Sequence, residues 1–129
     1  MVSTTRTVCS PSVGTFPDQD TVLNKLAKLI EGKVKGATYS CALEPSAYLK
    51  FVKLTEEQWN KVYGKVKYTK ELKYETEEEN LEDPASLANK AVEKWSSELK
   101  GVQATHFGCV VDAKPDSPKT TYKVACLFK

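Results

Sequence analysis

Hydrophobic side chains recur at helical spacing in the stretch that begins at Asp18. The residues that share this face are Val22, Leu23, Leu26, Ala27, Leu29 and Ile30. Apolar positions three to four residues apart predict an amphipathic helix that packs one side against a core. Asp18 or Asp20 can cap the start of this helix, and Gly32 and Gly36 are expected to end it.

Two shorter helices are predicted next. Residues 41–52 combine small and apolar side chains with Pro45, which fits the first turn of a helix because its missing N–H is not needed there. The sequence from Thr55 to Gln58 has the form of a capping box, in which two side chains satisfy backbone N–H groups at the helix start. This signal predicts a further helix that contains Trp59.

The strongest helical pattern follows Asp83 and Pro84. Its apolar face consists of Leu87, Ala88, Ala91, Val92, Trp95 and Leu99. Proline suits the first turn of a helix and glycine often follows its end, so we expect this helix to run from Asp83 and Pro84 to Gly101.

Residues 65–75 alternate with a period of two. The apolar positions are Val66, Tyr68, Leu72 and Tyr74, and the polar positions are Lys65, Lys67, Thr69, Glu71, Lys73 and Glu75. Alternation predicts a half-exposed strand, and its lysines are typical of a sheet edge that avoids pairing with other chains. Lys70 departs from the pattern. The acidic stretch 75–83 is expected to be a solvated loop.

The last two apolar segments each contain one cysteine and flank a turn-rich stretch at 114–119. If they pair as antiparallel strands about a midpoint at Ser117 and Pro118, Cys109 lies opposite Cys126, within reach of a disulfide. Both strands are apolar on two sides and need cover on both faces. The chain is therefore predicted to be an α+β protein, a three-layer α-β-α sandwich with a small antiparallel sheet.

Four cysteines allow three disulfide pairings, of which we favour Cys109–Cys126 together with Cys9–Cys41. Two bridges suit a secreted or surface-exposed domain. The alternative is a cytosolic protein with four reduced cysteines in its core.

The chain of 129 residues is predicted to consist of a polar N-terminal arm at 1–17 and a single domain at 18–129. The sequence contains no leader peptide and no apolar run long enough to cross a membrane. We expect an extracellular or cell-surface location, with signal and GPI-type anchor sequences removed.

The net charge is +2, and only one of the 19 basic residues is an arginine, which argues against nucleic-acid binding. The lysines in and near the predicted strand are a candidate contact for a sulfated glycan or a host surface. They are Lys61, Lys65, Lys67, Lys70 and Lys73. Solubility and protection of the sheet edge explain the same lysines, so both interpretations stay open.

Four short motifs follow one another along the chain. They are Tyr39-Ser40-Cys41-Ala42-Leu43-Glu44 with Ala47, Trp95-Ser96-Ser97-Glu98-Leu99, Thr105-His106-Phe107-Gly108-Cys109 and Tyr122-Lys123-Val124-Ala125-Cys126. Over residues 18–128 the chain thereby resembles the CAP superfamily (cysteine-rich secretory protein, antigen 5, pathogenesis-related). The resemblance implies an α-β-α sandwich, secretion or membrane tethering, and a role at a host interface. Within the superfamily the chain is most similar to surface antigens of coccidian parasites (Eimeria type), with secreted CAP proteins of nematodes as the second possibility.

The chain departs from this superfamily at the cleft, where CAP domains usually carry two histidines and two acids and sometimes bind a divalent metal. The segment Tyr48-Leu49-Lys50-Phe51 stands where the first histidine is expected, and the H-[FY]-T-Q motif of the second is absent. His106 is the only histidine of the chain and matches neither position. We therefore expect that the CAP cleft is lost and that no metal or cofactor is bound.

These features favour a non-enzymatic secreted or surface-tethered parasite antigen that contacts host cells or host proteins, in attachment or immune interaction. The contacts are expected from exposed loops and one strand face, at 75–83, 112–119 and 65–73. A membrane is expected as a partner only through a removed lipid anchor.

Two alternatives belong to other classes of protein. A small lipid- or sterol-binding carrier would line a cavity with aromatic side chains. Its candidate residues are Trp59, Trp95, Tyr48 and Phe51. An enzyme would need a proton donor or acceptor, for which Glu44 and Glu98 are the only candidates.

Overall fold

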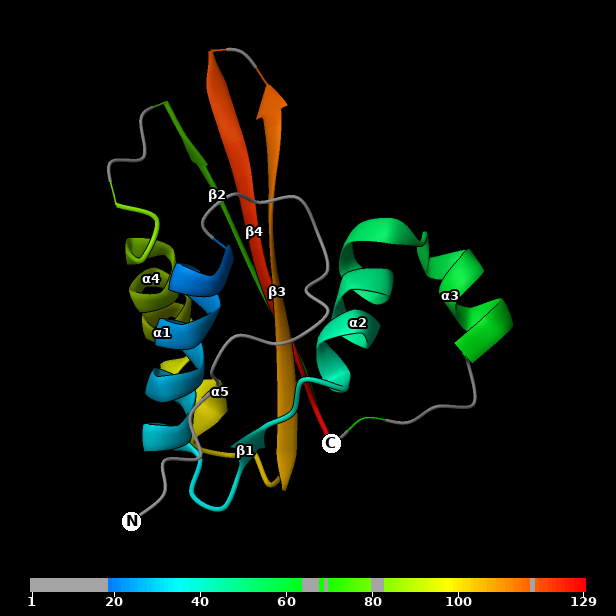
Figure 1. Ribbon diagram of the computed structural model, residues 1–129, viewed down its shortest axis with the longest axis vertical. Coiled ribbons are helices and arrows are strands. Elements are labelled where there is room, and N and C mark those ends of the chain that lie inside the picture. Colours follow the sequence, from blue (N-terminus) through cyan, green and yellow to red (C-terminus); the bar gives the residue numbers. More distant parts are fainter. Residues whose placement is uncertain (1–18, 64–67, 69, 80–82, 117) are drawn as a thin grey trace.

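The computed structural model describes residues 19–63, 68, 70–79, 83–116 and 118–129. A four-stranded sheet lies between two groups of helices (Figure 1). One group is α1 (Gln19–Lys33), α4 (Ser86–Lys94) and α5 (Ser96–Leu99), and the other is α2 (Leu43–Tyr48), the π-helix η1 (Leu49–Lys53) and α3 (Glu56–Tyr63). This arrangement confirms the predicted α-β-α sandwich. The N-terminal arm predicted at 1–17 lies outside the described residues.

The strands follow the order β1-β3-β4-β2 across the sheet. They are β1 (Thr38–Tyr39), β2 (Lys70–Glu78), β3 (His106–Asp116) and β4 (Lys119–Phe128). β4 pairs antiparallel with β3, as predicted, and also with β2, whose partner the sequence did not indicate, whereas β1 runs parallel to β3. The sheet is therefore mixed. A strand of two residues is too short to produce a periodic pattern, so the sequence does not predict β1.

The β3–β4 hairpin has the predicted register. Cys109 is opposite Cys126, and a disulfide joins the two, with their Cα atoms 4.0 Å apart. The Tyr39 hydroxyl accepts a hydrogen bond from the Cys109 N–H (3.2 Å) and lies 3.3 Å from the Cys109 carbonyl oxygen. Because these backbone groups point away from β4, the cysteine pair occupies a non-hydrogen-bonded site, where opposed Cα atoms approach most closely. Cys41 is also disulfide-bonded, and its predicted partner Cys9 lies outside the described residues.

The strand boundaries differ from the predicted ones. β2 begins at Lys70, so Tyr68 of the strand predicted at 65–75 lies outside it, and residues 65–67 and 69 are not among the described residues. The hairpin turn is shorter than the predicted stretch at 114–119, because β3 runs on to Asp116 and β4 begins at Lys119. β2 likewise continues to Glu78, so residues 75–78 of the predicted acidic loop are strand. Pairing with β4 supplies backbone hydrogen bonds that outweigh the low strand propensity of glutamate.

The helices begin near their predicted signals. Thr55 and Gln58 form the predicted capping box, in which each side-chain oxygen accepts a hydrogen bond from the backbone N–H of the other residue (3.1 and 3.0 Å). The helix predicted after Pro84 is interrupted at Trp95, where α4 passes into α5. The helix predicted at 41–52 is instead α2 followed directly by η1.

Alternate residues of β3 and β4 supply one apolar cluster on each face of the sheet. The larger cluster packs against α1, α4 and α5 and includes the Cys109–Cys126 disulfide. The smaller cluster packs against α2 and consists of Ala47, Val110, Ala125 and Leu127. β3 and β4, which are apolar on both sides, are thus covered by helices on both faces of the sheet, as their sequence requires. In the described part of the chain, no helix is long and apolar enough to cross a membrane.

Candidate functional site

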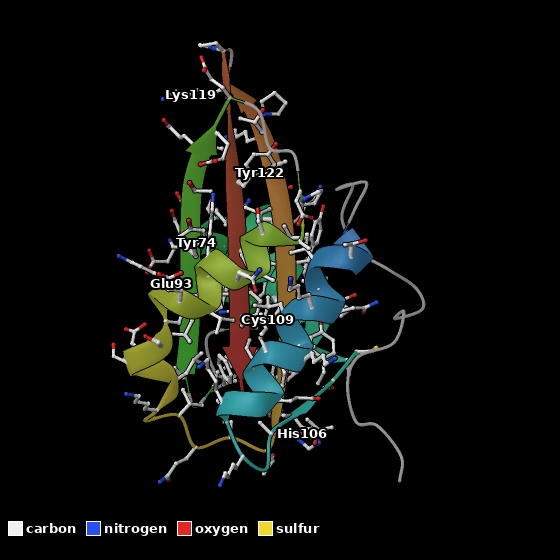
Figure 2. The ribbon with its side chains drawn as sticks, turned by 90° about the vertical axis from the view of Figure 1, so that its left-hand side faces the viewer. Tyr74, Glu93, His106, Cys109, Lys119 and Tyr122 are labelled. Atoms are coloured by element: carbon white, nitrogen blue, oxygen red, sulfur yellow. A yellow bond between two sulfur atoms is a disulfide. The ribbon has the colours of Figure 1, made fainter. Side chains whose placement is uncertain are left out.

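His106 lies at the exposed start of β3, where its Nδ1 is 2.9 Å from the Thr105 hydroxyl (Figure 2). Among the described residues, no group of three or more histidine, cysteine, aspartate and glutamate side chains could hold a metal ion. The histidine belongs to the exposed end of the sheet.

Glu44 and Glu98, the candidate acid–base groups, lie in opposite helical layers. Glu44 on α2 is 1% exposed, and its Oε1 accepts a hydrogen bond from the Tyr39 hydroxyl at 2.6 Å. Since that hydroxyl also contacts the backbone of Cys109, Glu44 helps to tie α2 and β1 to β3. Glu98 is exposed on α5, on the other side of the sheet (Figure 1). The two carboxylates do not form a pair.

The four aromatic residues predicted for a lipid cavity are also divided between the layers. Trp95 is buried in the larger cluster and donates its indole N–H to the Lys73 carbonyl oxygen at 3.2 Å. Tyr48 and Phe51 pack against the smaller cluster, and Trp59 is buried on α3 of the same layer. The four side chains are therefore divided between the two faces of the sheet, and only Phe51 and Trp59 line a common cleft.

On the side of the sheet that carries η1, part of the surface beside this helix stays open and carries mostly charged side chains. This surface, termed the charged sheet face, consists of Lys73, Glu75, Asp112, Lys114, Thr121 and Lys123. Strand alternation places all six on the side of the smaller cluster. Lys123 lies opposite both Glu75 and Asp112, and its Nζ is 4.0 Å from a Glu75 carboxylate oxygen. The face is therefore mixed in charge.

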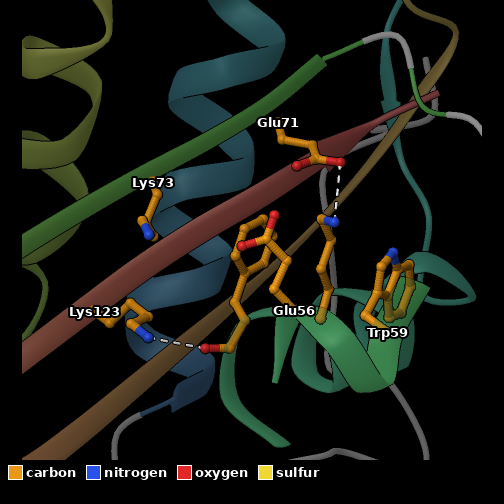
Figure 3. A pocket seen from close by; sticks show the side chains of 7 residues that line it. Glu56, Trp59, Glu71, Lys73 and Lys123 are labelled. Atoms are coloured by element: carbon orange, nitrogen blue, oxygen red, sulfur yellow. Dashed lines mark hydrogen bonds and ion pairs between the residues drawn. The ribbon is translucent and has the colours of Figure 1, made fainter. Parts of the chain in front are cut away.

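A cleft of about 360 Å³ borders this face beside η1 (Figure 3). Its lining consists of Lys50, Phe51, Glu56, Trp59, Glu71, Lys73 and Lys123. Lys50 forms an ion pair with Glu71 (3.4 Å), and its Nζ lies 4.9 Å from the centre of the Trp59 ring, a cation–π arrangement. Lys123 donates to the Phe51 carbonyl oxygen at 2.9 Å. A lining this charged suits polar groups and not an acyl chain.

The π-helix accounts for these contacts. Phe51 lies in the last turn of η1, where carbonyl groups lack a partner within the helix. A lysine ammonium group satisfies such a carbonyl and is favoured at the negative end of the helix dipole. Lys123 therefore fastens η1 to β4, while Lys50 fastens the same helix to β2. Short π-helical segments recur at functional sites.

The lysines predicted as a contact surface do not share one face. Lys73 is on the charged sheet face, Lys70 is on the opposite face of β2 by strand alternation, and Lys61 is exposed on α3. Lys65 and Lys67 lie outside the described residues. The contact of these lysines with a glycan or a host surface stays a prediction.

Two side chains near the ends of β2 have shifted pKa values. A hydrogen bond from the Thr76 hydroxyl (3.0 Å) and the nearby Lys90 ammonium group (3.4 Å) lower the pKa of Glu78. Burial raises the pKa of the Tyr68 phenol. The Glu78–Lys90 pair links β2 to α4.

Neither Lys123 of the charged sheet face nor Lys50 of the adjacent cleft was among the residues predicted from the sequence. A signal for Lys123 exists, because the register that sets Cys109 opposite Cys126 also sets Lys123 opposite Asp112. Lys50 has no such signal, since its contacts depend on a π-helix that no local pattern predicts.

The sequence matches the family described as Ancylostoma-associated secreted protein related over residues 9–128. No curated protein and no solved structure matches the chain. The family is CAP-related, in agreement with the order of the motifs and with the sandwich. Its name agrees with the secreted nematode proteins, one of the two groups that the motifs suggested. The match extends over nearly the whole sequence, and the chain therefore belongs to the Ancylostoma-associated secreted protein related family.

Proposed function

We propose that this protein is a secreted, non-enzymatic binding protein that contacts host cells or host proteins. Its family of secreted proteins and its disulfide-bonded cysteines support an extracellular location. The observation that carries the proposal is the charged sheet face, a surface on three paired strands that the helices leave uncovered.

The construction of this face favours a protein as the partner. Its strands are held by two antiparallel ladders and by the Cys109–Cys126 disulfide, so the charges occupy defined positions before binding. Acids and bases are interspersed on this face. Such a surface complements a protein surface of mixed charge better than it complements a uniformly charged polymer. A sulfated glycan is therefore the weaker candidate.

The positions of the other candidate groups support a binding role as well. Glu44 and Glu98 lie in opposite helical layers, so these two carboxylates are not placed to share a proton transfer. A lipid carrier would require an enclosed, mostly apolar cavity. The cleft beside η1 has five charged residues in its lining of seven.

The experiment compares two charge-reversal variants for binding to host cells. Lys73→Glu with Lys114→Glu changes the charged sheet face at two exposed lysines, whereas Lys28→Glu with Lys33→Glu changes two exposed lysines of α1. Fluorescently labelled protein and flow cytometry measure the binding. We expect the first variant to bind about tenfold more weakly and the α1 variant to bind like the wild type, as the loss of about 1.4 kcal/mol of contacts predicts.

Thermal unfolding of both variants provides the control for folding. Binding that is not saturable, or that falls equally in both variants, would contradict the proposed surface. Loss of binding in the α1 variant alone would move the contact to the other layer of the sandwich.

A further inference from the structure

The outer edge of β2 ends the sheet. β2 is the last strand in the order β1-β3-β4-β2, so β4 pairs with one of its sides and no described strand pairs with the other. The backbone groups along such a side can form hydrogen bonds with an additional strand. Which of them point outward follows from the cysteine pair.

Cys109 directs its N–H and C=O to the Tyr39 hydroxyl, so the groups of Cys126 do not bond to β3 and point toward β2. Leu72, opposite Cys126, therefore exchanges hydrogen bonds with β4. Pairing is continuous along β2, so every second residue from Glu71 to Glu77 points its N–H and C=O away from the sheet. The Trp95 indole confirms this orientation independently, because it donates to the Lys73 carbonyl oxygen from outside the ladder.

The two halves of this edge differ. In the first half, around Lys73, the Lys73 carbonyl oxygen already accepts a hydrogen bond from the Trp95 indole. The lysine side chains of this half also discourage pairing with a further strand. In the second half, no described residue outside the sheet forms a hydrogen bond with the backbone of Glu75 or Glu77. The Glu77 side chain is exposed and makes no ion pair with a residue that the structure describes. The open half of the edge is therefore acidic.

We propose that the edge of β2 at Glu75 and Glu77 binds an extended, lysine- or arginine-bearing segment of a partner protein as an additional strand. The proposal rests on the proposed function and names the kind of partner. Strand addition supplies affinity through backbone hydrogen bonds and specificity through alternate side chains. Pairing of two copies through this half would set Glu75 opposite Glu77 of the second copy, and like charges in opposed positions are unfavourable. A basic segment removes that repulsion.

The two sides of the edge define the pattern of the added strand. Side chains beside Glu75 and Glu77 would be basic, since directly opposed residues lie on the same face. On the other face, Tyr74 lines a recess of about 440 Å³ together with Lys90, Glu93 and Lys94 of α4 (Figure 2). A β-branched or aromatic side chain fits beside the tyrosine ring. The expected segment therefore alternates basic residues with β-branched or aromatic ones.

The test uses a seven-residue peptide, capped at both ends, in which lysine alternates with valine and threonine. Isothermal titration calorimetry measures its affinity for the full chain. One control peptide has glutamate in place of lysine, and another keeps the lysines but has N-methylated amides on its pairing side. We expect the N-methylated peptide to bind about tenfold more weakly, because it loses two or so backbone hydrogen bonds, and the glutamate peptide not to bind.

A change in the protein tests the same contact from the other side. Glu77→Pro removes an N–H that points outward and leaves the ladder with β4 intact, so the variant should fold and bind the peptide about fivefold more weakly. Glu77→Gln keeps the N–H and removes the charge. The decrease in peptide affinity that this variant causes should therefore become smaller as salt is added. Glu57→Gln, on exposed α3, serves as the control with unchanged affinity. In amide hydrogen exchange, the peptide should protect Glu75 and Glu77 selectively.

Three outcomes would overturn the proposal. Equal binding of the lysine and N-methylated peptides would reduce the contact to charge attraction. If the protein forms concentration-dependent dimers and Glu77→Pro abolishes them, the edge of β2 binds a second copy of this chain and not a basic segment of another protein. Host-cell binding without any peptide binding would refute strand addition and leave the proposed function in place. Peptide binding without host-cell binding would instead contradict the proposed function and leave strand addition in place.

Discussion

Gly108 lies where β3 passes closest to α2. A Cβ atom at this position would stand 2.5 Å from the Leu43 Cβ and 2.9 Å from the Glu44 backbone nitrogen, and the backbone of α2 cannot move aside as a flexible side chain would. We expect Gly108→Ala to lower the free energy of unfolding by about 1–3 kcal/mol, the usual cost of overpacking. Urea unfolding followed by tryptophan fluorescence measures the change.

Gly101 supplies the matched control. A Cβ atom there would have as its nearest neighbour the Glu98 carbonyl oxygen at 3.8 Å, an ordinary contact, and the backbone is not in the left-handed region. Gly101→Ala should therefore leave stability unchanged or raise it slightly. Similar losses in both variants would show that steric overlap with α2 is not the cause.

The Tyr39 hydroxyl joins three elements, because it contacts Glu44 of α2 and the backbone of Cys109 in β3 from its own place in β1. Tyr39→Phe keeps the ring against Phe107 and removes these hydrogen bonds. The expected loss is about 1–3 kcal/mol, since buried polar groups are left poorly satisfied. Tyr48→Phe is the comparison, because the Tyr48 hydroxyl forms no hydrogen bond with a described residue, and a change beyond about 0.5 kcal/mol there would weaken the explanation.

At the scale of elements, Glu78 links the edge strand β2 to α4. The Thr76 hydroxyl and then the Lys90 ammonium group favour the ionised carboxylate, so its pKa in the folded protein is lowered. The stabilising contribution is therefore present above the pKa of the same carboxyl in the unfolded chain, and it is lost as the pH falls through the lower folded value. Carboxyl carbon NMR should show this titration at a lower pH than in an unstructured peptide that contains Glu78.

Variants at Thr76 separate the two causes. Thr76→Val removes the hydroxyl and should raise the pKa of Glu78, whereas Thr76→Ser keeps the hydroxyl and should leave it lowered. If both variants titrate alike, Lys90 alone is responsible.

At the scale of the whole molecule, the layers follow from the sequence more directly than the binding surface does. Apolar residues on both sides of β3 and β4 require cover on two faces, and the opposed cysteines set the hairpin register. The contacts around Lys50 could not be predicted, because they join η1, α3 and β2 and arise only once a π-helix has formed. Residues 75–78 look like a loop in isolation and become strand through pairing with β4.

The distribution of charge over the sheet distinguishes a glycan from a protein as the partner. Lys73 stands between Glu71 and Glu75 on one face of β2, while Lys70 points to the other face, so a linear sulfated chain would meet acids as well as lysines. We expect the protein to elute from a heparin column at a salt concentration below the physiological one. At physiological salt, exposed charges are screened over about 8 Å, which weakens the attraction further. Glu71→Gln with Glu75→Gln should elute distinctly later, because it removes the flanking acids and makes this face basic. Retention of the wild type above physiological salt would contradict the mixed-charge argument and restore the sulfated glycan as a partner.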